Sequence, residues 1–146
     1  MPFEIRRPHH DEHERVRSLV SDIVNETYGS IWPTTPIDVG EEDWDAGWVA
    51  ARAGDLLGWM LTQDCWLDDL WVSSKFRRQG VGSALLQRGE REIAARGIAT
   101  AHLHVIASNK RAIAFYEKRG WRPRAGNPAR NRAGPKAGDD KSHRMT

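Results

Sequence analysis

The hydrophobic positions in the first half of the chain change from a helical to an extended period. After a weak alternation at residues 3–7, apolar side chains recur at helical spacing through residues 10–24. Residues 47–52 and 56–62 then alternate as the two strands of a hairpin, and residues 65–72 follow as a third strand. Three strands in such close succession predict an antiparallel meander.

The second half of the chain alternates between helix and strand patterns. Residues 81–97 and 109–119 have helical periodicity, and residues 101–106 between them predict a strand. Because a strand, a helix and another strand follow one another, we expect a right-handed crossover between parallel strands. The predicted fold class is therefore α/β, with a mixed, mostly antiparallel sheet and one right-handed β–α–β crossover.

The length of the chain, 146 residues, suits a single domain over residues 1–146. Residues 124–142 are rich in Gly, Pro, Asn, Arg and Lys and have no apolar periodicity, which predicts a long basic loop that could be disordered. Residues 143–146 resemble the beginning of a last strand, cut short where the sequence stops.

The composition argues against several classes of protein. Cys65 is the one cysteine, so an internal disulfide or a cysteine-based metal site cannot form, and no metal cofactor is expected. The N-terminal residues are polar and charged, unlike a signal peptide, and no apolar run approaches the roughly 20 residues of a membrane-spanning helix. We therefore expect a cytoplasmic protein without a membrane partner.

The small net charge of +2 hides an asymmetry along the chain. Residues 1–109 carry 11 Lys and Arg against 17 Asp and Glu, whereas residues 110–146 carry 11 against 3. The acidic part favours a cationic partner, and the basic part favours phosphates. Because the basic part lacks interleaved aromatic residues for stacking on single strands, nucleic acid ranks last among the expected partners.

A glycine-rich segment joins the third predicted strand to the helix that follows it. Its sequence is Arg77-Arg78-Gln79-Gly80-Val81-Gly82-Ser83. The first N–H groups of a helix have no acceptor within the helix, and the helix dipole favours negative charge there, so the segment predicts a phosphate site. The two glycines let a ligand approach the backbone, and the arginines can add charge-assisted hydrogen bonds. The alternative is a helix that merely begins with glycines beside surface arginines.

Two motifs in this region resemble those of the GNAT superfamily, the acetyl-CoA-dependent N-acyltransferases. Motif A of that family is similar to Leu70-Trp71-Val72 followed by Arg77-Arg78-Gln79-Gly80-Val81-Gly82-Ser83-Ala84-Leu85-Leu86. Motif B is similar to Asn109-x-x-Ala112-x-x-Phe115-Tyr116-x-x-x-Gly120-Trp121. The resemblance covers about residues 68–121. It implies the GNAT fold, in which the sheet is splayed at its central strand and helices cover both faces.

The resemblance also implies which residues bind acetyl-CoA as the cosubstrate. The backbone N–H groups of residues 78–83 would hold the pyrophosphate, and the main chain of Leu70 and Val72 would bond the pantetheine arm and the thioester carbonyl. Asn109 would meet the arm from the second helix. The implied set is Leu70, Trp71, Val72, Arg77, Arg78, Gln79, Gly80, Val81, Gly82, Ser83, Asn109 and Tyr116.

The candidate catalytic residues are Tyr116, His104 and Leu70. Tyr116 would face the thioester sulfur. Because a phenol pKa near 10 lies above the thiol pKa of about 8.5, a hydrogen bond from Tyr116 to the thiolate is a better description than full protonation of the thiolate. The N–H of Leu70 would support the tetrahedral oxyanion. His104 is the candidate base, although several family members carry a glutamate there. The alternatives are a structural aromatic residue for Tyr116 and a half-buried structural histidine for His104.

The residues that would bind the acceptor are less specific. Asp68 is in phase with Leu70 and points away from Asp69 unless a bulge intervenes, so Asp68 could bind an ammonium group or relay protons. Tyr28 and Trp32 open an acidic, aromatic stretch that is expected to select a cationic amine by charge and cation–π contact. The alternatives are a carboxylate paired to an arginine and a solvated loop with its tryptophans packed inward. The other members of the stretch are Asp38, Glu41, Glu42, Asp43 and Trp44.

These expectations combine into one predicted reaction. An acetyl group would move from acetyl-CoA to a primary amine of a small molecule or peptide by direct attack, with Tyr116 assisting the thiolate leaving group. The alternative is a non-catalytic acyl-CoA sensor of the same fold, which would bind acetyl-CoA without turnover. The acceptor, the general base and the oligomeric state, a homodimer included, stay open.

Overall fold

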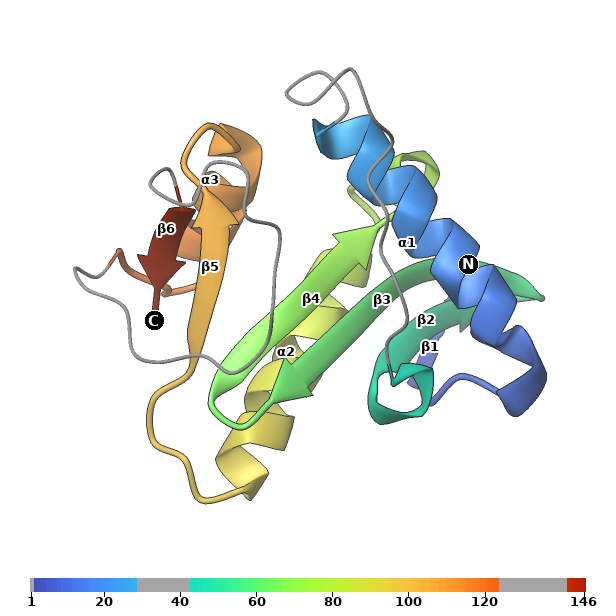
Figure 1. Ribbon diagram of the computed structural model, residues 1–146, viewed down its shortest axis with the longest axis horizontal. Coiled ribbons are helices and arrows are strands. Elements are labelled where there is room, and N and C mark those ends of the chain that lie inside the picture. Colours follow the sequence, from blue (N-terminus) through green and yellow to red (C-terminus); the bar gives the residue numbers. More distant parts are fainter. Residues whose placement is uncertain (1, 29–42, 124–141) are drawn as a thin grey trace. The chain divides into compact units, whose positions relative to one another are not determined.

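A computed structural model describes residues 2–28, 43–123 and 142–146 of the chain, with the backbone alone at residues 142–144. The chain divides into two compact units, Met1–Ile98 and Ala99–Thr146. Each unit is described by itself (Figure 1). The prediction of a single domain over residues 1–146 stays a prediction.

The first unit contains four antiparallel strands that pair in chain order. They are β1 (Glu4–Arg6), β2 (Trp48–Arg52), β3 (Asp55–Gln63) and β4 (Trp66–Val72). The turn between β2 and β3 contains Ala53 and Gly54 with φ of +50° and +89°, as a tight two-residue hairpin requires. The predicted meander is confirmed, with strand ends shifted by one residue or so.

Two helices cover opposite faces of this sheet (Figure 1). The short 3₁₀ helix η1 (His10–Glu12) leads into α1 (His13–Tyr28), and α2 (Val81–Ala95) lies behind β3 and β4. Because both faces are covered, every residue of β3 from Leu56 to Thr62 is buried. A strand with one face exposed would instead alternate between buried and exposed residues. The predicted helix at residues 10–24 therefore exists, but it begins with a 3₁₀ turn and runs on to Tyr28.

Two glycines set how closely α2 approaches the sheet. A Cβ at Gly89 of α2 would lie 3.0 Å from Leu67 Cδ1 and 3.2 Å from Met60 Sδ. A Cβ at Gly58 of β3 would lie 2.9 Å from Leu85 Cδ1 of the same helix. Side chains at these two positions would push α2 away from the strands, so the glycines fix the contact between α2 and the sheet.

The second unit contains the antiparallel pair β5 (His102–Ile106) and β6 (Ser142–Met145) and the helix α3 (Lys110–Lys118). Asn109 caps α3, because its Oδ1 accepts a hydrogen bond from the Ala112 amide at 3.2 Å. Arg122 and Thr146 exchange two backbone hydrogen bonds of 2.8 and 3.0 Å. The predicted strand at 101–106, the capped helix and the short last strand are thus confirmed.

Some predictions lie outside the described residues. They concern Trp32 and the acidic positions Asp38, Glu41 and Glu42, and the basic loop at 124–142 apart from Ser142, which is the first residue of β6. Among the described helices, none is both long and apolar enough to cross a membrane.

Candidate active site

The turn that leads from β4 into α2 has the backbone of an anion-binding loop. Arg78 has φ of +65° and Gly80 has φ of +83°, and α2 begins directly afterwards at Val81. The Ala84 amide donates the first helical hydrogen bond to the Gly80 carbonyl at 3.0 Å. The amides of Val81 and Gly82 precede that bond and lie at the positive end of the helix dipole. No atom lies within 4 Å of where a Gly80 Cβ would be, so this side of the turn is open.

Neighbouring elements of the first unit hold the turn in place. Glu26 near the end of α1 accepts a hydrogen bond from Ser74 Oγ at 3.1 Å and lies 3.5 Å from Arg77 Nη2. Arg52 of β2 donates a hydrogen bond to Gln79 Oε1 at 3.0 Å. The side chains of Arg77 and Gln79 thus contact the protein itself, and Arg78 between them is half-buried.

The backbone of β4 alternates in direction along the strand. The Ser73 amide donates to the Leu57 carbonyl of β3 at 2.9 Å, and the register pairs Trp71 with Trp59. In an antiparallel ladder every second residue directs its N–H and C=O at the same neighbour. Trp71 therefore bonds toward β3, and the N–H and C=O groups of Leu70 and Val72 point away from β3.

A β-bulge interrupts β4 at one of the predicted acceptor residues. Leu61 pairs with Asp69 and Thr62 pairs with Leu67, so Asp68 is the extra residue. Strict alternation would place Asp69 on the face of Leu67. The bulge moves Asp69 to the face of Trp59, whose indole N–H donates to Asp69 Oδ2 at 3.2 Å. Sequence reasoning favoured Asp68 by strand phase alone, and it missed the carboxylate that lies among the aromatic residues.

That face of the sheet carries a row of aromatic side chains. Trp44 and Trp59 are both buried and meet edge to face at 5.1 Å between ring centroids. Tyr28, the last residue of α1, meets Trp71 in the same way at 6.0 Å. Tyr28 and Trp44 of the acidic, aromatic stretch are packed inward. This agrees with the alternative left open by the sequence, in which the aromatic residues of the stretch are structural.

The second unit positions the remaining candidates. Tyr116 of α3 is 8% exposed, and its ring contacts those of Phe115 at 5.3 Å and Trp121 at 6.0 Å between centroids. His104 of β5 lies on the half-buried face of the strand, opposite the buried residues Leu103 and Val105. The α3 helix therefore fixes the aromatic ring of Tyr116 by packing, and β5 presents His104 on its more exposed side.

Comparison with protein-family models shows which family the chain belongs to. The family model described as "Acetyltransferase (GNAT) family" matches residues 17–121, well over half of the chain. The chain belongs to the GNAT family. The match runs across the boundary between the two compact units and includes every motif residue from Leu70 to Trp121.

Solved structures confirm the predicted GNAT fold. The N-acetyltransferase paia from Thermoplasma acidophilum, solved in complex with coenzyme A, has a TM-score of 0.73 at 16% identity and covers 99% of this chain and 98% of its own. The ribosomal-protein-S18-alanine N-acetyltransferase from Escherichia coli has a TM-score of 0.66 at 22% identity and covers 99% and 92%. At these identities the likeness shows the α/β fold class alone.

A curated relative is more similar over a shorter span. The [ribosomal protein bS18]-alanine N-acetyltransferase of Escherichia coli strain K12 is 39% identical over 72 residues. The alignment covers 47% of this GNAT chain and 49% of the relative, so the chain spans about half the length of the curated relative that it matches.

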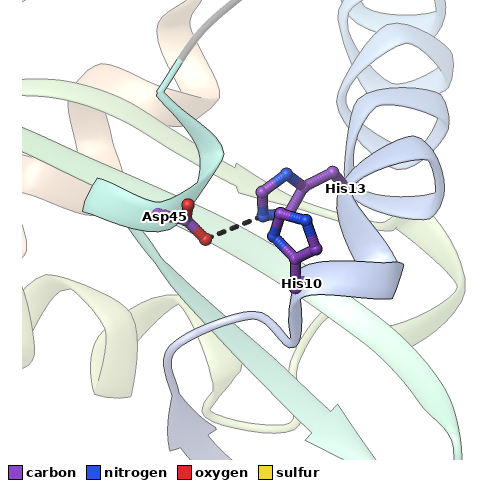
Figure 2. Close-up of side chains that lie close together, drawn as sticks. All are labelled: His10, His13 and Asp45. Carbon is purple, nitrogen blue, oxygen red and sulfur yellow. Dashed lines mark hydrogen bonds and ion pairs between the residues drawn. The ribbon is translucent and has the colours of Figure 1, made fainter.

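Sequence reasoning also missed a cluster of side chains that could hold a metal. Ligand atoms of His10, His13 and Asp45 lie within 4.8 Å of one another (Figure 2). The spacing of the two histidines at the start of a helix is visible in the sequence and could have drawn attention. Asp45, 32 positions after His13, could not have been joined to them without the fold.

Proposed function

We propose that this GNAT protein transfers the acetyl group of acetyl-CoA to a primary amine of a peptide or protein. The observation that carries the proposal is the open turn with positive φ at Arg78 and Gly80, at the N-terminus of α2. This is the type of backbone that binds a phosphate group, and it lies in the segment where the GNAT motif assigns the pyrophosphate of coenzyme A. A family neighbour was solved with coenzyme A bound.

The donor half of the reaction is assigned to the turn and to β4. Amides at the start of α2 hold the pyrophosphate, with the half-buried Arg78 adding charge. The N–H and C=O groups of Leu70 and Val72, which point away from β3, bond the pantetheine arm. The N–H of Leu70 then stabilises the oxyanion that forms when the amine attacks the thioester carbonyl.

The leaving thiolate is assigned to Tyr116. Full proton transfer from a phenol to a thiolate is uphill by roughly 2 kcal/mol, from the difference between their ordinary pKa values at about 1.36 kcal/mol per unit. Tyr116 therefore acts through a hydrogen bond that strengthens as negative charge develops on sulfur. The packing of its ring between Phe115 and Trp121 supports this role, because a fixed ring holds the hydroxyl in one place.

The attacking amine must lose its proton, and His104 is assigned as the base that takes it. Neutralising a lysine-like ammonium group at pH 7 costs about 4.6 kcal/mol, which is why a base or a water chain is needed. A peptide α-amine has an ordinary pKa of about 8, so its neutralisation costs only about 1 to 1.5 kcal/mol. The lower cost favours an α-amine, and the relative that acetylates a ribosomal-protein alanine supports that choice.

A thiol-release assay over a panel of amines tests the proposed reaction. The panel contains alanine-initiated peptides, lysine peptides with blocked N-termini, polyamines and aminoglycosides, each with acetyl-CoA. We expect the highest kcat/KM for free peptide N-termini. Turnover of a small-molecule amine alone would overturn the acceptor class, and acetyl-CoA binding without turnover of any amine would favour a sensor.

A pair of glycine substitutions tests the pyrophosphate site. Gly80 and Gly97 lie at opposite ends of α2, have φ of +83° and +80°, and have no atom within 4 Å of a built Cβ. Gly80→Ala and Gly97→Ala should therefore share a similar backbone cost of about 1–2 kcal/mol. Gly80→Ala alone should weaken coenzyme A binding in calorimetry. Equal affinities for the two variants would exclude the turn as the pyrophosphate site.

A further inference from the structure

A group of three potential metal ligands lies at the start of α1, apart from the residues assigned to acetyl transfer. His10 belongs to η1 and His13 is the first residue of α1, while Asp45 belongs to the 3₁₀ helix η2 (Trp44–Ala46). Their ligand atoms lie within 4.8 Å of one another, and both imidazole rings face the carboxylate in Figure 2. All three residues lie in the first unit, so their arrangement is internal to it.

We propose that His10, His13 and Asp45 bind one divalent transition-metal ion of the zinc class. Two imidazoles and one carboxylate are ligands that Zn²⁺ commonly takes, with bonds of about 2.0–2.2 Å. Ca²⁺ and Mg²⁺ prefer oxygen ligands throughout, so two imidazoles disfavour them. Three protein ligands leave the fourth tetrahedral position to water.

The distances leave little movement for the side chains to make. Tetrahedral bonds of this length separate two ligand atoms by about 3.3 Å. His13 Nε2 and Asp45 Oδ1 are 2.8 Å apart and share a hydrogen bond (Figure 2). A metal ion would replace the proton of this hydrogen bond, and the nitrogen and oxygen atoms would separate by about half an ångström. His10, which is exposed as Asp45 is, closes the remaining distance by turning about its side-chain bonds.

The backbones that carry the three ligands are anchored by buried neighbours. Glu12, directly before His13, is 7% exposed and accepts hydrogen bonds from Arg6 and from the His9 amide. Trp44, directly before Asp45, is 5% exposed and packs against Trp59. Ligands on fixed backbones lose less entropy when they bind an ion, so the geometry favours binding over a chance meeting of surface side chains.

The surrounding charges also suit a cation. Asp11, Glu14 and Asp43 lie within two positions of the ligands in the sequence. Two neighbouring cations have partners of their own: Arg7 binds the Ala46 and Gly47 carbonyls and so holds the end of η2, and Arg15 lies 3.6 Å from Glu12 Oε2. The two histidines precede residue 17, where the GNAT family match begins, whereas Asp45 lies within the matched span.

Calorimetric titration of the full chain with ZnCl₂, after removal of metal by EDTA, tests the proposal. The wild-type protein should bind one Zn²⁺ per chain and unfold at a higher temperature when Zn²⁺ is present. Co²⁺ in place of Zn²⁺ should give the visible absorption of a four-coordinate ion with nitrogen and oxygen ligands. Loss of an outer-shell partner typically weakens metal binding about 10- to 100-fold, so loss of a direct ligand should weaken it at least as much.

The informative variants are His10→Gln, His13→Gln and Asp45→Asn. A glutamine at position 13 can still donate a hydrogen bond to Asp45, so the fold does not depend on the lost ligand. The control is His9→Gln, which removes an adjacent histidine outside the cluster. We expect the three variants to lose the Zn²⁺-dependent rise in unfolding temperature and the control to keep it. No saturable binding by the wild type, or equal binding by His13→Gln, would overturn the site and leave a surface hydrogen bond.

Discussion

The substitution Glu12→Gln should destabilise the first unit strongly at neutral pH and weakly in acid. Glu12 is 7% exposed, and its oxygens accept hydrogen bonds from Arg6 Nη1 at 2.8 Å and Arg6 Nη2 at 3.0 Å. The His9 amide adds a third at 2.7 Å. These interactions, the Arg6 hydrogen bonds first, lower the pKa of Glu12 from 4.5 to about 2 despite the opposing cost of burial.

The pKa shift gives the size and the direction of the effect. A lowering of about 2.5 units corresponds to roughly 3 kcal/mol of stability at pH 7, at about 1.36 kcal/mol per unit. Because the folded-state pKa is depressed, the contribution is complete above the unfolded pKa near 4.5 and is lost as pH falls towards 2. Arg6 keeps contact with solvent and with Glu4, so we expect a loss of about 2–3 kcal/mol for Glu12→Gln rather than the larger cost of a fully buried pair.

Urea unfolding followed by tryptophan fluorescence at pH 7 and at pH 3 measures this difference. The gap in unfolding free energy between wild type and Glu12→Gln should shrink by about 2 kcal/mol on going to pH 3, where the wild-type carboxylate has lost most of its contribution. Glu4→Gln is the matched control, because Glu4 contacts the same arginine but is mostly exposed, and it should cost about 0–1 kcal/mol. A gap that is small at pH 7, or equal at both pH values, would refute the reasoning.

Three further substitutions separate catalysis from packing. Tyr116→Phe keeps the ring packed against Trp121 and removes only the hydroxyl, so kcat should fall about tenfold or more while calorimetric coenzyme A affinity stays the same; unchanged turnover removes Tyr116 from the mechanism. His104→Gln should abolish the acidic limb of the kcat/KM profile, and an identical pH profile would exclude His104 as the base. Gly47→Ala should lower the unfolding free energy by about 1–3 kcal/mol in urea, because the new Cβ would lie 2.1 Å from Trp59 Cη2 while the backbone φ of −103° is ordinary; a wild-type midpoint would mean that the Trp59 ring moves aside.

Local signals predicted the elements of this fold well. The hairpin and meander follow from alternation and turn residues, and the caps at Asn109 and Gly97 mark helix ends where short-range chemistry places them. The helix at residues 10–24 was predicted too short at its C-terminal end. The reason is tertiary: Tyr28 packs edge to face on Trp71 of β4, a contact that no periodicity within α1 contains.

The candidate site also has features that local sequence predicts and features that only tertiary contacts determine. The turn at Arg78 and Gly80 could be predicted because glycine placement and a helix start are both local, and the positive φ angles agree with that expectation. The direction of Asp68 and Asp69 could not, because one inserted residue in β4 reverses the alternation on which the prediction depended. A bulge is set by the pairing with β3, and pairing is absent from the sequence of β4 alone.

The cluster of His10, His13 and Asp45 shows how both kinds of information combine. The spacing of the two histidines is local and would place them on neighbouring positions of any helix start. Asp45 joins them only because Trp44 is buried against Trp59, which brings η2 over the start of α1. The position of Asp45 therefore depends on the packing of Trp44 as well as on its hydrogen bond with His13. It follows that a change at Trp44 should weaken Zn²⁺ binding without touching a ligand, whereas the control His9→Gln should leave it intact.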